Sequence, residues 1–150
     1  MSDFKSKYGP SFKKTLDFMK AHLNTHTCDE WDELSLAVRD LQYTPDLKGL
    51  ESSLIVAVLD EMERLYEQER TNMSIEDFDA EYRSDFAWVY TFALTYYGKD
   101  ITHADTKASL SNDIAHAKKS SEFLNDLARA SYEEIILPNR AKNPTTVNAA

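Results

Sequence analysis

Two histidines and the single cysteine lie close together in this sequence and could bind a metal ion. His22 and His26 are four residues apart, so on one continuous helix they would share a face, and Cys28 could be a third ligand. However, we expect His26 to lie past the end of its helix. The glutamate of the zinc-protease motif is also absent, because Leu23 follows His22. The alternative is a polar helix end with a small buried cysteine, and we expect no metal or other cofactor.

Other catalytic patterns are weaker still. His103 and His116 are thirteen residues apart, and no Glu-x-x-His pair of the helical di-iron type occurs. Cys28 near a helix start could have a lowered pKa, but the adjacent Asp29 and Glu30 oppose that change. With three glycines in the whole chain, a glycine-rich phosphate loop is not expected. An enzyme with a metal or carboxylate site is therefore the second hypothesis and not the first.

The acidic run at residues 60–69 resembles, in composition, the carboxylate-lined helices of all-α nucleotide pyrophosphohydrolases. That resemblance implies magnesium held by paired E-x-x-E and E-x-x-D motifs. This chain does not place such a pair of motifs on two consecutive helices. A solvated helix face is the simpler explanation of the run.

The net charge of −9 is concentrated in the middle of the chain. Residues 1–27 carry +3, residues 28–85 carry −12, and residues 86–150 carry zero. A strongly negative field repels nucleic acid and anionic membranes and attracts basic partners. We therefore expect no direct binding to nucleic acid or membrane.

Acidic side chains repeat at helical spacing through this middle segment. Carboxylates one helical turn apart lie about 5–6 Å from each other, a scale similar to that of phosphates along a DNA strand. If neighbouring helices present these side chains on one side, they could occupy a basic groove; the alternative is an acidic surface that only maintains solubility. The candidate partner-binding residues are Asp29, Glu30, Asp32, Glu33, Glu63, Glu67, Asp77 and Glu81.

Helices must position these residues, because apolar side chains recur every three or four residues along the chain. We predict a first helix from Pro10 to Leu23. A second helix should follow the capping box at Thr27 and Glu30. A third should follow Thr44-Pro45, with its start delayed by Gly49. The third helix should bury one face, formed by Leu47, Leu50, Leu54, Val58, Met62 and Leu65.

The stretch at residues 85–100, DFAWVYTFALTYYGKD, alternates like a strand but follows a helical stripe that begins at Ile75. A lone strand would leave its backbone unpaired, so we predict a helix over residues 75–97, capped by Ser74 and ended by Gly98. Tyr90, Tyr96 and Tyr97 could be an exposed anchor for a partner, but a core position is favoured.

Two further helices are expected in the last third of the chain. Thr102 with Asp105 could cap the first, and SLSND at residues 109–113 looks like a break. A seam rich in small residues follows, formed by Ala117, Ser121, Leu124, Ala128, Ser131 and Ile135. Such a seam could pair two copies of the chain, which makes a structural subunit or homo-oligomer the third hypothesis.

The sequence thus predicts an all-α, single-domain bundle of five or six helices over residues 10–137. Residues 1–9 are expected to be flexible and residues 138–150 to be a disordered tail. No apolar signal core or membrane span is evident, and one cysteine fits a reducing compartment, so we expect a cytoplasmic protein.

In size, charge and helical make-up, the chain resembles two groups of small acidic helical proteins. One comprises the proteins of phages and mobile elements that block restriction or CRISPR machinery, and the other the immunity proteins that neutralise bacterial toxins. The resemblance covers no defined motif. It implies a non-catalytic inhibitor that engages a basic, nucleic-acid-handling protein through its acidic middle helices.

Overall fold

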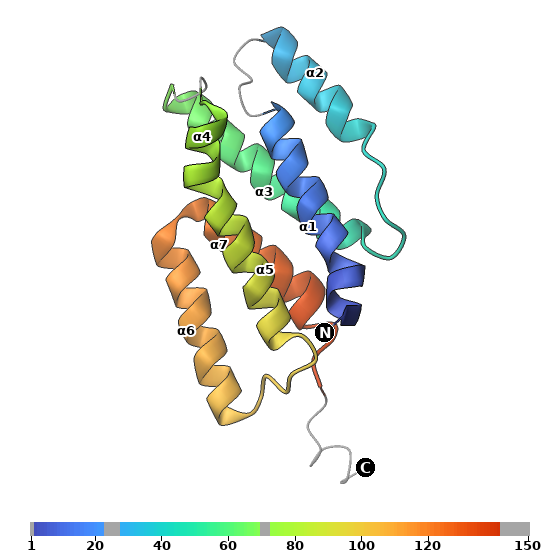
Figure 1. Ribbon diagram of the computed structural model, residues 1–150, viewed down its shortest axis with the longest axis vertical. Coiled ribbons are helices and arrows are strands. Elements are labelled where there is room, and N and C mark those ends of the chain that lie inside the picture. The colour runs from blue at the N-terminus through green and yellow to red at the C-terminus, as the bar shows by residue number, and fades with distance from the viewer. Residues whose placement is uncertain (1, 23–27, 70–72, 142–150) are drawn as a thin grey trace.

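The computed structural model describes residues 2–22, 28–69 and 73–141, and these residues form six helices and no strand (Figure 1). An uninterrupted helix combines α4, the π-helical turn η1 and α5, and α7 continues into the π-helical turn η2. The predicted all-α, single-domain bundle is confirmed. The elements are α1 (Ser2–His22), α2 (Cys28–Arg39), α3 (Lys48–Glu67), α4 (Ile75–Phe78), η1 (Asp79–Arg83), α5 (Ser84–Tyr96), α6 (Ala104–Ser120), α7 (Glu122–Ser131) and η2 (Tyr132–Ile136).

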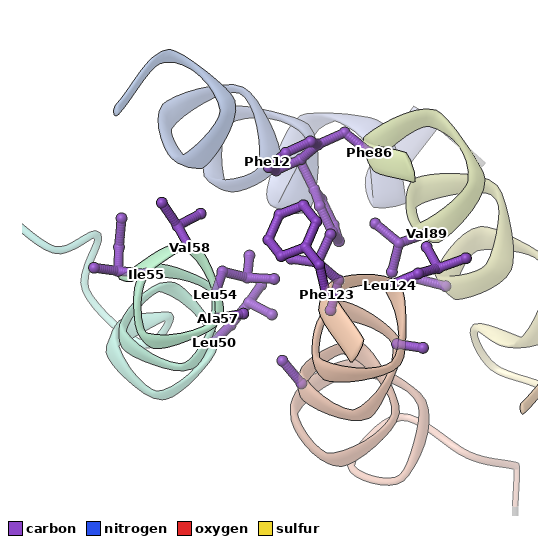
Figure 2. Close-up of a cluster of buried hydrophobic side chains, with 14 of the residues drawn as sticks. Phe12, Leu50, Leu54, Ile55, Ala57, Val58, Phe86, Val89, Phe123 and Leu124 are labelled. Carbon is purple, nitrogen blue, oxygen red and sulfur yellow. The ribbon is translucent and has the colours of Figure 1, made fainter. Parts of the chain in front are cut away.

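Four helices enclose the core. Each of α1 and α7 packs against both α3 and α5, so the four form a ring around one apolar interior. Figure 2 shows Phe12 of α1, Leu54 of α3 and Phe123 of α7 gathered in the space between them. α6 covers the outside of α7, and α2 lies at the edge of the bundle beyond α1 and α3 (Figure 1).

Most of the predicted helix signals act as expected along the middle of the chain. The cap expected at Thr44 is wrong, because the N-cap of α3 is Leu47, which makes no side-chain capping hydrogen bond. All six residues of the predicted apolar face on α3 are buried, and the helix begins only at Lys48. The hydroxyl Oγ of Ser74 accepts a hydrogen bond of 3.1 Å from the backbone N–H of Asp77, which caps α4. Gly98 follows α5 with φ of +71°, a conformation that favours glycine.

The aromatic stretch at residues 85–100 is helical, and its tyrosines belong to the core. Tyr96 is only 2% exposed. The rings of Tyr90 and Tyr97 each lie 5.3 Å from the ring of Phe4, edge to face. The interpretation of these residues as core, and not as an exposed anchor, is confirmed.

The expected flexibility of residues 1–9 is wrong for the residues described. α1 begins at Ser2 and continues through Pro10. Phe4 and Tyr8 are buried, and with Phe12 they extend the four-residue spacing of the helix back to its first turn. Their rings pack on Tyr90 of α5 and on Tyr97 directly after it, so burial of apolar surface holds this segment in place.

The expected cap and break in the fifth helix are also wrong. Thr102 donates to Asp100 instead of capping, and α6 begins after His103, whose side chain makes no capping hydrogen bond. The segment at residues 109–113 continues the helix without a break. Its polar residues have a partner there, since the hydroxyl of Tyr96 lies 2.7 Å from Ser109 Oγ and 2.6 Å from Asp113 Oδ2.

The chain breaks instead at Ser121, which is extended and caps α7 through a 3.0 Å hydrogen bond from the N–H of Leu124. Apart from Ser121, every residue of the predicted small-residue seam is buried against neighbouring helices of the same chain. The seam therefore serves the bundle itself and leaves no exposed face there for a second copy.

The boundary of the predicted tail is wrong by several residues. Asn139 donates a 2.9 Å hydrogen bond to the hydroxyl of Tyr8, and the N–H of Ala141 donates one of the same length to the carbonyl of Lys99. These bonds fix residues 138–141 to the end of the bundle where α1 begins. Residues 142–150 lie outside the described chain.

Candidate functional site

An exposed acidic ridge runs along α3. Val56, Asp60, Glu63 and Glu67 follow one another at steps of three and four residues and all face solvent. We call these four residues the α3 ridge. In the described part of the chain, no cation lies within ion-pair distance of its three carboxylates. The described residues therefore leave the charge of the ridge without an ion-pair partner.

A groove lies on each side of the ridge. Between α3 and α7, a groove of about 280 Å³ has a floor of small side chains and carries acids together with one arginine. Between α2 and α3, a groove of about 310 Å³ has a floor of apolar side chains. Asp60 lines both grooves. The first is lined by Ser52, Ser53, Val56, Ala57, Asp60, Asp126, Arg129, Ala130 and Glu133, and the second by Trp31, Leu34, Ser35, Val38, Leu59, Asp60 and Glu63.

The predicted partner-binding residues are divided between two places. Glu63 and Glu67 belong to the α3 ridge, and Asp32 and Glu33 are exposed on α2, the helix across the groove. Glu30 on α2 is partly buried. Asp29 is in the first turn of α2, but its side chain lies outside the described part of the structure.

The other two predicted residues lie on a different element. Asp77 is exposed in α4 and Glu81 is partly buried in η1. Neither residue lines the grooves beside the ridge. A single binding face that contains all eight predicted acids therefore stays a prediction.

Arg64 neutralises another part of the acidic segment. Its guanidinium lies 2.9 Å from Glu61, 3.4 Å from Glu122 and 3.6 Å from Asp126, and the hydroxyl of Tyr82 donates a 2.5 Å hydrogen bond to Glu61. Burial works to lower the pKa of Arg64, but these carboxylates outweigh it and raise the pKa. This cluster links α3 to α7 and η1, so its acids serve the fold.

Asp85 is a described acid whose ionisation is opposed by its surroundings. It is partly buried at the start of α5, and burial, followed by repulsion from Glu61 and Glu81, raises its pKa to about 6. The unfolded chain has the ordinary pKa of 3.8. The folded state therefore gains stability as the pH falls from about 6 towards 4, and is penalised by the charge of Asp85 above that range.

We expect Asp85→Asn to raise the free energy of unfolding at pH 7.5 by about 1 kcal/mol, after the shift is reduced for solvent screening of a half-exposed group. The gain should disappear near pH 3, below both pKa values, where Asp85 is largely protonated in both states. Urea denaturation at the two pH values measures it. Asp60→Asn is the control, because that acid is exposed and should change stability by less than about 0.5 kcal/mol. An equal gain for both variants would show that only net charge matters.

No group of three or more possible metal ligands comes together among the described residues. His22 ends α1 with its ring 4.7 Å from that of Phe18, and burial lowers its pKa. His26 and the side chain of Cys28 lie outside the described part of the structure. Whether these three residues could come together, which the sequence did not favour, therefore stays untested.

Tyr66 and Asp126 are surface residues that the sequence reasoning missed. Tyr66 is 45% exposed, and its ring meets that of Trp31 edge to face at 5.8 Å. Its position directly after the core residue Leu65 was a usable signal, because adjacent helical residues point in different directions. Asp126 had no such signal, since only the packing of α7 on α3 brings it to the groove.

Comparison with family models, curated proteins and solved structures found no match to this chain. Among the described residues, no helix combines the length and the apolar character needed to cross a membrane. The functional argument therefore depends on the surface itself.

Proposed function

We propose that this protein is a non-catalytic binding protein whose α3 ridge engages a basic site on another protein. The observation that carries the proposal is the row of exposed carboxylates at Asp60, Glu63 and Glu67, which has no cation within ion-pair distance in the described chain. A basic groove that binds nucleic-acid phosphates would offer matching charge. The proposed partner is thus a nucleic-acid-handling protein, and the proposed role is that of an inhibitor.

The surroundings of the ridge support a protein partner in preference to a simple solubilising surface. Val56 and Tyr66 are large side chains that are 54% and 45% exposed on the same helix. Protein interfaces combine a few aromatic or apolar anchors with a charged rim that guides association. Grooves on both sides of the ridge give such a partner places for its side chains.

The test is capture of partners from a lysate of the source cells with tagged protein, nuclease treatment, low and high salt, and mass spectrometry. We expect one basic nucleic-acid-handling protein to be retained at low salt and released as salt rises. The captured partner is then purified and its affinity measured. A triple variant should bind it at least about tenfold more weakly than the wild type; the three changes are Asp60→Lys, Glu63→Lys and Glu67→Lys.

The matched control reverses three exposed acids on α1 and α6, namely Asp3, Asp17 and Asp105. This variant changes the net charge by the same amount, but at positions away from the ridge. It should therefore lose clearly less affinity for the partner than the ridge variant. Thermal unfolding of both variants confirms that they are folded. Equal affinity of the ridge variant and the wild type would exclude the proposal, and equal losses in both variants would reduce it to a general effect of charge.

A further inference from the structure

α2 lies at the edge of the bundle and contacts it through long side chains. In Figure 1, α2 is separated from the other helices along most of its length. Its only buried residue in the described part is Leu34, while Trp31 and Val38 are half-buried above α3. The groove of about 310 Å³ between α2 and α3 is therefore an incompletely filled interface.

The groove has the lining that attracts a cation. Trp31 lines the groove, and its ring meets that of Tyr66 at 5.8 Å with an interplanar angle of 89°, so the two rings form an aromatic corner. Asp60 and Glu63 line the same groove. Aromatic faces attract cations through their negative quadrupole, and nearby carboxylates add direct charge attraction.

Two other grooves of the described structure lack this selectivity. In the groove between α3 and α7, Arg129 lies among the acids. In the groove of about 400 Å³ between α1 and α5, Lys13 pairs with Asp17 at 2.9 Å and Arg83 with Asp79 at 3.9 Å, so its charged rim is largely neutralised. In the groove between α2 and α3, both charged residues of the lining are acids.

We propose that the groove between α2 and α3 accepts an arginine side chain of the protein partner. The guanidinium would stack on Trp31 or Tyr66 and donate hydrogen bonds to Glu63 and Asp60. Arginine fits better than lysine because its planar guanidinium stacks on aromatic rings and matches a carboxylate with two parallel donors. This assignment deepens the proposed function. It rests on that function, because the proposed function is what makes the arginine part of a protein partner.

The probe is acetyl-Gly-Arg-Gly-amide, compared with the same peptide containing lysine or the neutral isostere citrulline. Trp88→Phe removes the other tryptophan, which stacks on Phe92 in α5, so that tryptophan fluorescence reports on Trp31 alone. We expect the arginine peptide to change this fluorescence saturably. The lysine peptide should bind about threefold more weakly and the citrulline peptide about tenfold more weakly.

In the Trp88→Phe background, Glu63→Gln and Tyr66→Leu should each weaken binding of the arginine peptide by about threefold or more. Glu133→Gln removes the same charge from the groove between α3 and α7 and should change binding of the arginine peptide by less than about twofold. Equal binding of the citrulline peptide, or equal effects of Glu63→Gln and Glu133→Gln, would overturn the arginine site.

The two proposals can fail separately. If reversing the ridge abolishes binding of the captured partner but the arginine peptide does not bind, the arginine site is wrong and the proposed function stands. If the arginine peptide binds as expected but reversing the ridge leaves the partner's binding unchanged, the site is correct and the proposed function is wrong.

Discussion

Replacing Glu51 by alanine should lower the free energy of unfolding by about 3 kcal/mol at pH 7, because it breaks a buried charged network. The Glu51 side chain is 1% exposed and accepts hydrogen bonds from Ser11 Oγ at 2.6 Å, Lys14 Nζ at 2.7 Å and the N–H of Thr44 at 2.9 Å. These donors belong to α1 and to the loop before α3. Glu51 thus joins three parts of the chain at one carboxylate.

The pKa of Glu51 expresses the same contacts as a free energy. Burial works to raise the pKa, but the hydrogen bonds from Lys14, Ser11 and Thr44 outweigh it and hold the pKa at about 2, below the ordinary 4.5. That difference corresponds to about 3 kcal/mol. The contribution is fully present above pH 4.5 and is lost as the pH falls through 4.5 towards 2.

Urea denaturation followed by circular dichroism at pH 7 and at pH 3 measures the loss. Glu51→Ala should lose less relative to the wild type at pH 3 than at pH 7. Glu51→Gln, which keeps one acceptor oxygen, should be less damaging at pH 7. Glu67→Ala removes an exposed acid from the same helix and should stay within about 0.5 kcal/mol of the wild type. If Glu51→Ala were as stable as that control, the network would make no net contribution to the free energy of unfolding.

The second large effect is expected at the start of the chain, where Phe4→Ala should cost about 4 kcal/mol. Phe4 is 0% exposed, and its ring lies 5.2 Å from Tyr8 and 5.3 Å from both Tyr90 and Tyr97. Truncation would remove these ring contacts and leave a cavity that the surrounding rings cannot fill without moving.

Lys5→Ala is the matched control, because Lys5 is the exposed neighbour of Phe4 in the same turn. It should change the free energy of unfolding by less than about 0.5 kcal/mol in the same urea experiment. Similar stabilities of the two variants would mean that residues 2–9 do not dock on α5 in solution, as the sequence alone suggested.

The helices of the middle of the chain could be predicted because their signals are local. The apolar stripe of α3 repeats with the helical period, Ser74 caps α4 from three residues away, and Gly98 supplies the positive φ after α5. The helical period from Ile75 also overrode the strand-like alternation in the following residues. Each of these signals depends on residues within one or two turns of each other.

The predictions from the sequence were wrong where residues far apart in the chain contact each other. Pro10 suggested a helix start, yet Phe4 and Tyr8 extend α1 by packing on side chains about ninety positions away. Polar residues 109–113 suggested a break, yet the hydroxyl of Tyr96 satisfies two of them inside a continuous helix. Local composition cannot show such partners.

The sequence by itself determined that this protein is a helical bundle with an acidic middle, because helical periodicity and charge are properties of neighbouring residues. Only the tertiary structure decided which acids are available to a partner. Glu61 and Glu63 are two residues apart but point about 200° apart around α3. The packing of η1 and α7 therefore gives Glu61 to Tyr82 and Arg64, while Glu63 remains on the exposed ridge.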